Sequence, residues 1–283
     1  MDRCEQYQVI KGQYRLRRGG FAPDLTDEEV ITMEICGEYF KLGCDKDIFA
    51  YFYPHYRPFF PKLTERSKFV RQAANLWQVK AALQKRLVMV SGQTQDPVQV
   101  IDTLPLPVCV ITRAIRDRCF QQEADFGYCA AKDLHYYGFK LGLRISRIGM
   151  IVHYPLLATR PHDIHALLEG FEGIAAGDKG FIDAFRQALL EERHGITVVT
   201  PVRKNMTATL PKPLLRFCKR VRKCVETVGS HLTERFGVGR IRVHDLWHFQ
   251  HRLIRKILAH TVCVFLNLSF GRPALDLDGL IAS

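Results

Sequence analysis

Hydrophobic and polar positions follow a helical spacing in the first part of the chain. Thr26 begins a predicted helix that extends through Phe40, and three acidic residues follow it directly, as in a capping box. Thr64 begins a second predicted helix that runs to about Leu87. We therefore predict a small all-α N-terminal domain over residues 1–95, whose short helices suit a helix-turn-helix DNA reader and a plain packing module equally well.

From residue 96 onward, short apolar runs of strand length alternate with helical stretches. The predicted strands are 98–101, 134–146, 148–157, 174–176 and 197–202, and the predicted helices are 162–171, 183–194, 214–236 and 246–268. Strands and helices in this order form a mixed sheet with helices on both faces. We predict an α/β fold for residues 96–283.

Two acidic residues follow predicted strands, and a third lies in a predicted helix. Asp102 ends the first strand, and Asp178 follows a later one between Gly177 and Gly180, which allow a sharp turn and the close approach of a ligand. Glu226 lies within the helix 214–236. Sites of open α/β sheets form beyond the strand ends, where a packed helix can reach in, so these three carboxylates can converge.

Each of these acids also has an ordinary structural interpretation. Asp102 and Asp178 suit turns in which an Asp side chain accepts a backbone N–H. Glu226 can pair with Arg222 in its own helix, although a base N-terminal to the acid is the weaker orientation. Glu234 lies eight residues farther along, roughly 80° around the helix, and is a rival third acid.

The charge of the chain favours a polyanionic partner. The sequence has 41 Lys and Arg against 29 Asp and Glu, a net charge of +12, and a pI near 9.4. Residues 203–256 contain 14 Lys and Arg against 3 acids, so nearly all of the excess surrounds Glu226. The predicted DNA-binding residues are Lys219, Arg222, Lys223, Arg235, Arg252, Arg255 and Lys256.

The last predicted helix supports the same interpretation. One arc of it is basic, with Arg252, Arg255 and Lys256 beside two histidines, and the opposite arc is apolar. A solvated face is the usual explanation for such an arc, but charges of one sign repel one another, so a polyphosphate partner is favoured. Trp247 and Phe249 can stack on bases or lie in the core.

Other features exclude several classes of protein. A 47% hydrophobic content predicts a real core, and nine cysteines without a CxxC pair indicate reduced thiols in a cytoplasmic protein. No signal peptide is evident, and the apolar run 257–270 is too short to span a membrane, so no membrane partner is predicted. His162 and His165 suit the first turn of a helix better than a zinc site.

Three carboxylates in a basic protein suit divalent metal ions acting on nucleic acid. Cleavage of a phosphodiester requires stabilisation of charge on the attacking and the leaving oxygen, which two ions about 3.5–4 Å apart provide. We expect two Mg²⁺ ions, for which Mn²⁺ can substitute. Without metal, the acids repel one another.

The chain also resembles a known family through a series of short motifs. These are Val100–Cys109, Tyr136–Lys140, Gly177–Phe181, Arg222–Thr227 with Leu232–Phe236, Asp245–His248 and, near the N-terminus, Phe69–Trp77. In this order they resemble bacterial insertion-sequence transposases, most closely insertion-sequence family nine-eighty-two. That family belongs to the DDE class, whose catalytic core has a ribonuclease-H-like fold.

The resemblance implies roles for particular residues. It identifies Asp102, Asp178 and Glu226 as the catalytic, metal-binding triad, in preference to Glu234, and matches Arg222 to an Arg that related transposases place shortly before the Glu. The wider class often has a Tyr and a Lys at positions that are Lys219 and Thr233 here. In their place, Lys219 or Arg235 can position phosphate.

The implied function is a transposase that binds terminal inverted repeats, cuts the DNA ends and transfers them to target DNA, working as a homodimer. Residues 1–95 would bind the DNA ends, and residues 96–283 would form the catalytic domain. Its location would be the bacterial cytoplasm, in association with the nucleoid. Two alternatives remain: a catalytically inactive DNA-binding derivative of the same fold, and a ribonuclease-H-like nuclease without strand transfer.

Overall fold

Within the described residues, the N-terminal region contains helices and no strand. The computed structural model describes residues 7–10, 22–114, 119–120, 123–129, 133–157, 159, 164–201 and 211–280, so His162 lies outside the described residues. The first helices are α2 (Asp27–Tyr39), α3 (Asp45–His55), α4 (Arg66–Asn75) and α5 (Trp77–Val90). Thr26 caps α2 through the predicted capping box. The prediction of one helix from Thr64 to Leu87 was wrong, because the chain breaks at Leu76 into α4 and α5.

A mixed sheet follows the helices and confirms the predicted α/β class. Its strands are β1 (Val98–Val110), β2 (Asp125–Cys129), β3 (Leu134–Ser146), β4 (Ile151–His153), β5 (Leu156–Leu157), β6 (Gly173–Ala176) and β7 (Ile196–Val199). The order is β2-β3-β1-β6-β7, with β4 and β5 also paired to β3. β1 runs antiparallel to β3 and parallel to β6. The sequence did not predict β2, and the run predicted as one strand over 148–157 forms β4 and β5.

The first strand is much longer than predicted. It does not end at Asp102 but continues to Val110, paired with β3 along almost its whole length. On the other side, β6 pairs only with residues 98–100. Pro105 and Pro107 are therefore tolerated inside the strand, because a free edge does not require their missing N–H groups. Asp102 lies just beyond the last position at which β1 pairs with β6.

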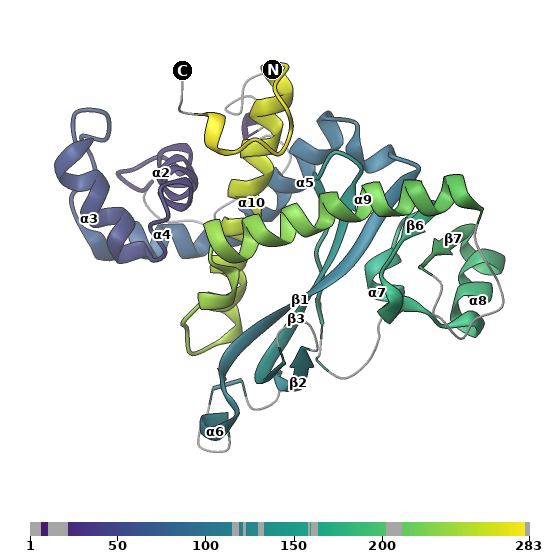
Figure 1. Cartoon of the computed structure of the whole chain (residues 1–283). Helices are drawn as coiled ribbons and strands as arrows, with labels where there is room; N and C mark the ends of the chain where they lie inside the picture. The colour runs from purple at the N-terminus through teal and green to yellow at the C-terminus, as the bar shows by residue number, and fades with distance from the viewer. Residues whose placement is uncertain are drawn as a thin grey trace.

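Helices cover both faces of the sheet (Figure 1). They are α7 (Ile164–Leu168) and α8 (Ala184–His194) on one side, α9 (Lys212–Ser230) and α10 (Leu246–Ser269) on the other, and the short α6 (Ile111–Ala114) at the far end of β1. Side chains of β1 alternate between the two cores. Val100 packs in the core that contains Val225 of α9, whereas Ile101 packs with Leu167 of α7 and Leu190 of α8. Asp102 is thereby directed toward α9.

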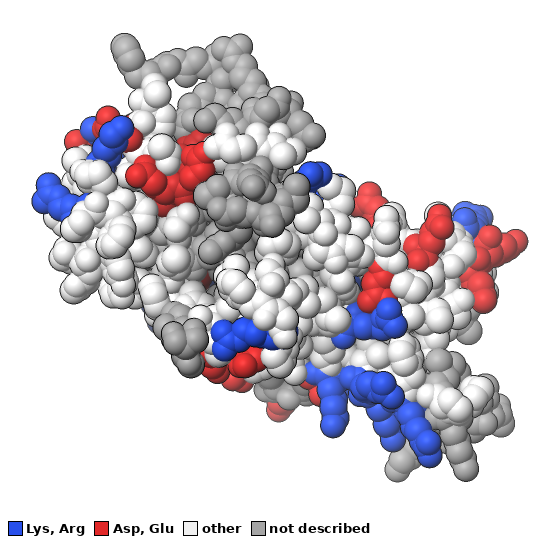
Figure 2. Space-filling view, turned by 90° about the horizontal axis from the view of Figure 1, so that it is seen from above, with Lys and Arg blue, Asp and Glu red and all other residues white. Residues whose placement is uncertain are grey.

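Helix α9 has one buried and one basic face. Val221, Val225 and Val228 are buried beneath it. The exposed side carries basic residues at i, i+3, i+4 and i+7 spacing, which places them on one face: Arg216, Lys219, Arg220 and Lys223. Figure 2 shows a row of Lys and Arg side chains over this helix. Lys219 and Lys223, both predicted to bind DNA, are among these exposed residues.

Helix α10 corrects the prediction about its charged arc. It packs against α2, α4 and α5, and Arg255 and Lys256 are only 0% and 3% exposed. This arc faces acidic side chains of the N-terminal helices, so the prediction that Arg255 and Lys256 contact DNA was wrong. Phe249 lies in the core, whereas Trp247 is 38% exposed. Within the described residues, no helix is both long and apolar enough to cross a membrane.

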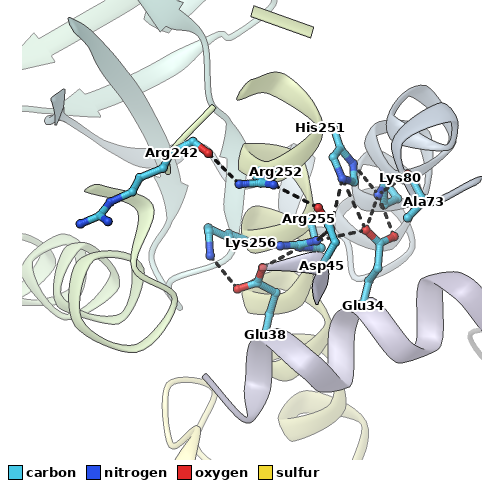
Figure 3. A network of polar contacts seen from close by, with 10 residues as sticks. All are labelled: Glu34, Glu38, Asp45, Ala73, Lys80, Arg242, His251, Arg252, Arg255 and Lys256. Carbon is cyan, nitrogen blue, oxygen red and sulfur yellow. Dashed lines mark hydrogen bonds and ion pairs between the residues drawn. The ribbon is translucent and has the colours of Figure 1, made fainter. Parts of the chain in front are cut away.

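The charged arc belongs to a buried ionic network (Figure 3). Lys80 of α5 donates to both carboxylate oxygens of Glu34, at 2.9 and 2.7 Å, and its Nζ lies 3.0 Å from His251 Nδ1. From α10, Arg255 Nε donates to Glu38 at 2.6 Å, and Lys256 Nζ donates to the other oxygen of Glu38 at 2.8 Å. Ion pairs thus connect α2 and α5 to the last helix of the chain.

Two further predicted DNA-binding residues also have partners within the chain. Arg252 donates to Asp45 at 3.2 Å and to the carbonyl oxygen of Arg242 at 2.8 Å. Arg235 pairs with Asp278 and lies over the ring of Tyr39, 4.5 Å from its centroid. The guanidinium groups of Arg235 and Arg252 are therefore occupied in structural contacts, which removes the basis for assigning DNA contacts to them.

Replacing Lys80 with Met should destabilise the fold strongly. The substitution leaves the buried Glu34 carboxylate without its closest cation, and breaking a buried ion pair typically costs about 3–5 kcal/mol. The exposed pair of Lys68 with Asp24 provides the matched control, and Lys68→Met should change stability little. Urea unfolding measures both variants, and equal midpoints would contradict the importance of the network.

Acid should destabilise the protein from about pH 6.5 downward. Burial lowers the pKa of both His251 and His260 from 6.5 to about 3. The folded state thus binds fewer protons than the unfolded state, so this contribution is complete above pH 6.5 and is lost as the pH falls toward 3. Neither ring nitrogen of His260 has a hydrogen-bond partner among the residues that the structure describes. We expect His260→Leu to flatten the decline in unfolding free energy over this range, and an unchanged slope would argue against it.

Candidate active site

The parallel register of β1 and β6 brings Asp102 and Asp178 together. Val100 pairs with Ala176, the last residue of β6. Asp102 lies two residues after Val100, and Asp178 lies two residues after Ala176. Both acids therefore leave the parallel pair of strands at the same level. The predicted juxtaposition of these acids at one strand edge thus arises from register, although Asp102 is not at the end of its strand.

The loop after β6 holds Asp178 in a tight turn. Its Oδ1 accepts the backbone N–H of Gly180. Neither Gly177 nor Gly180 has a positive φ, so the sharp turn does not explain the glycines. A Cβ on Gly177 would lie 3.0 Å from Phe181 Cδ2 and 3.2 Å from Ile101 Cγ1. Gly177 is therefore required for close packing against β1.

The Asp102 carboxyl has a raised pKa. Burial is the largest cause of the rise to about 6, and the negative charges of Asp178 and Glu226 contribute to it. The Thr103 N–H, which donates to Asp102 Oδ1 at 2.7 Å, and the Arg222 cation oppose this rise in pKa. A buried acid beside two other acids is the electrostatic setting that a bound cation would stabilise.

Helix α9 supplies the third acid and a cation between the acids. Arg222 Nη2 lies 3.9 Å from Asp178 Oδ2 and 3.8 Å from Glu226 Oε1. The helix passes close to β1 at Gly229, where an added Cβ would lie 3.5 Å from Leu104. Glu234 is exposed in the π-helical turn after α9. The helix carboxylate whose charge acts on Asp102 is Glu226.

The three acids are close but not gathered to coordination distance. Among the described residues, the group of acids and histidines with ligand atoms within 4.8 Å of one another is Glu34, Asp45 and His251. Asp102, Asp178 and Glu226 do not meet this distance criterion as a group. The Glu226 side chain is 63% exposed, so it has room to move.

The cluster of Glu34, Asp45 and His251 does not fit a metal ion. Lys80 donates to both oxygens of Glu34, and Arg255 donates to Asp45. These cations already neutralise the acids, and a metal ion would have to displace them from a buried site. We assign this cluster to the fold. The sequence carried a signal for it that was missed: Glu34 and Glu38 at i, i+4 match His251 and Arg255 at the same spacing.

Comparison with known proteins identifies the family. A family model described as a transposase DDE domain matches residues 92–245, which include Asp102, Asp178 and Glu226. No curated protein and no solved structure matches the chain. The matched segment spans more than half of the 283 residues. The chain therefore belongs to the family of proteins with a transposase DDE domain.

Proposed function

We propose that this chain is the transposase of an insertion sequence of family nine-eighty-two. It binds the terminal inverted repeats of its element, cuts the DNA at those ends, and joins the freed 3′-hydroxyls to target DNA. The observation that carries the proposal is the placement of Asp102, Asp178 and Glu226 around Arg222 in a chain of the DDE transposase family.

Asp102, Asp178 and Glu226 are the proposed ligands of two Mg²⁺ ions. Their oxygen donors are those that Mg²⁺ prefers, and the negative charges of Asp178 and Glu226 that help to raise the pKa of Asp102 would be offset by bound cations. Bound metal would supply charge stabilisation at the attacking and leaving oxygens of the phosphodiester. Mn²⁺ has the same ligand preference and is expected to substitute.

The chain's own residues then position the DNA. Lys219 and Lys223 are exposed on α9, where they can hold the phosphate backbone, and Arg222 lies one helical turn before Glu226. Arg222 also screens Asp178 from Glu226, which keeps the acids together before DNA arrives. We assign recognition of the ends to the helical region within residues 1–95, and we propose that two copies act together on two ends.

Substitution of the triad should separate cleavage from binding. Asp102→Asn and Glu226→Gln each remove a metal ligand without changing the size of the side chain, so Mg²⁺-dependent cleavage should be abolished while end binding is retained. The assay uses labelled DNA that carries the inverted repeats flanking the coding sequence. Glu234→Gln is the matched control and should cleave normally.

The products of the same assay decide between the alternatives. With a target plasmid present, a transposase gives joined product, a ribonuclease-H-like nuclease gives only nicked product, and an inactive derivative gives neither. Cleavage that persists in Asp102→Asn or Glu226→Gln would refute the assignment of the triad.

Metal binding should also appear in the titration of Asp102. Its carboxyl carbon, followed by NMR, should titrate near pH 6 in the metal-free protein, because burial disfavours the charged form. Protons compete with metal for this group, so Mg²⁺ affinity should rise as the pH increases through 6. Asp178→Asn should lower the pKa of Asp102. An Asp102 pKa near 4 in the metal-free protein would contradict the buried site.

A further inference from the structure

A second candidate binding site lies among the helices. A groove of about 1100 Å³ runs between α3, α4 and the first turn of α10, and none of the three acids lines it. Its residues come from segments far apart in sequence, from Lys46 to His248. The groove is therefore built by the packing of α10 against the N-terminal helices.

Aromatic rings line much of this groove. Phe49 and Tyr53 of α3 lie one helical turn apart and stack with ring centroids 5.3 Å apart and an interplanar angle of 22°. Trp247 of α10 also lines the groove, and it is 38% exposed. A large ring left partly in water at a concave surface offers a stacking partner to a planar ligand.

The rim of the groove is basic. Lys46, Arg66 and Arg71 line it and are exposed. No ion pair recorded between described side chains involves these three cations, whereas the one acid of the groove, Glu65, pairs with Lys68 at 3.2 Å. A free positive rim around apolar rings is complementary to a ligand with flat bases and negatively charged phosphates.

We propose that this groove binds a short unpaired segment of DNA. A base stacks on Trp247, the stacked pair of Phe49 and Tyr53 forms the apolar wall beside it, and the phosphates lie along Lys46, Arg66 and Arg71. Duplex DNA hides the faces of its bases, so it can use the cations but not the rings. An apolar helix of a protein partner can use the rings but leaves three cations without counter-charge.

The biological source of such a strand rests on the proposed function, because cutting at the element ends exposes unpaired nucleotides. Binding by the groove does not itself require the triad. The two proposals can therefore fail independently.

The test uses the full chain and a fluorescein-labelled oligothymidylate of about 10 nucleotides, a length within the usual site size for single strands. Anisotropy should show that Trp247→Ala weakens binding roughly tenfold, since one base stacked on an aromatic ring contributes about 1–3 kcal/mol. A duplex of equal length should be unaffected by this substitution. Charge reversal of Arg71 to Glu should weaken single-strand binding as well, whereas Arg193→Glu on α8 is the matched control and should not.

Intrinsic fluorescence gives a second readout, because the chain has only two tryptophans, Trp77 and Trp247. Oligothymidylate should quench the wild type, and Trp247→Phe should retain affinity but lose the quenching. Two results would refute single-strand binding by the groove, even if Asp102→Asn abolishes cleavage. They are an unchanged single-strand affinity in Trp247→Ala and quenching that persists in Trp247→Phe. If Trp247→Ala loses single-strand binding while Asp102→Asn still cleaves DNA, the groove is supported as a single-strand site and the catalytic role of the three acids is refuted.

Discussion

The parallel pairing of β1 with β6 is the constraint on which the candidate active site depends. Three paired positions, from Val98 with Ile174 to Val100 with Ala176, set where the two acids emerge from the ladder. A slip of one residue would turn Asp102 away from α9, because neighbouring side chains of a strand point to opposite faces. Pairing of β1 with β6 ends at Val100, and Asp102 and Asp178 each follow two residues after their strand's last paired position.

A second constraint concerns where the positive charge is used. Arg255 and Lys256 are buried against Glu38, and Arg252 pairs with Asp45, so the cations of α10 join the last helix to α2 and α3. The exposed cations of α9 remain available near Asp102, Asp178 and Glu226. Around the groove, Lys46, Arg66 and Arg71 form a separate basic surface. The excess charge of the sequence thus serves two purposes, and only part of it is available to DNA.

The class of the fold could be predicted from the sequence, because strand and helix periods are local properties. The three acids stay a prediction, and the preference for Glu226 over Glu234 came from the family resemblance and not from local pattern. The length of β1 could not be predicted, since Pro105 and Pro107 indicate a strand end unless the free edge is known. The arc of α10 was misjudged for a related reason. A helix with one charged and one apolar face looks like a surface helix, and only tertiary packing shows that Glu34, Glu38 and Asp45 cover the charged face.

Iron-directed cleavage of the protein tests the central claim most directly. When hydrogen peroxide and ascorbate are added, Fe²⁺ bound in place of Mg²⁺ reduces peroxide to hydroxide and a hydroxyl radical, and ascorbate returns the iron to Fe²⁺. The radicals cut the polypeptide near the metal ligands, so the fragments map the residues around the metal. We predict cuts close to Asp102, Asp178 and Glu226 together, suppressed by excess Mg²⁺ and absent in Asp102→Asn. Cuts near Glu34, Asp45 and His251 instead, or no cut near Glu226, would contradict the proposed triad.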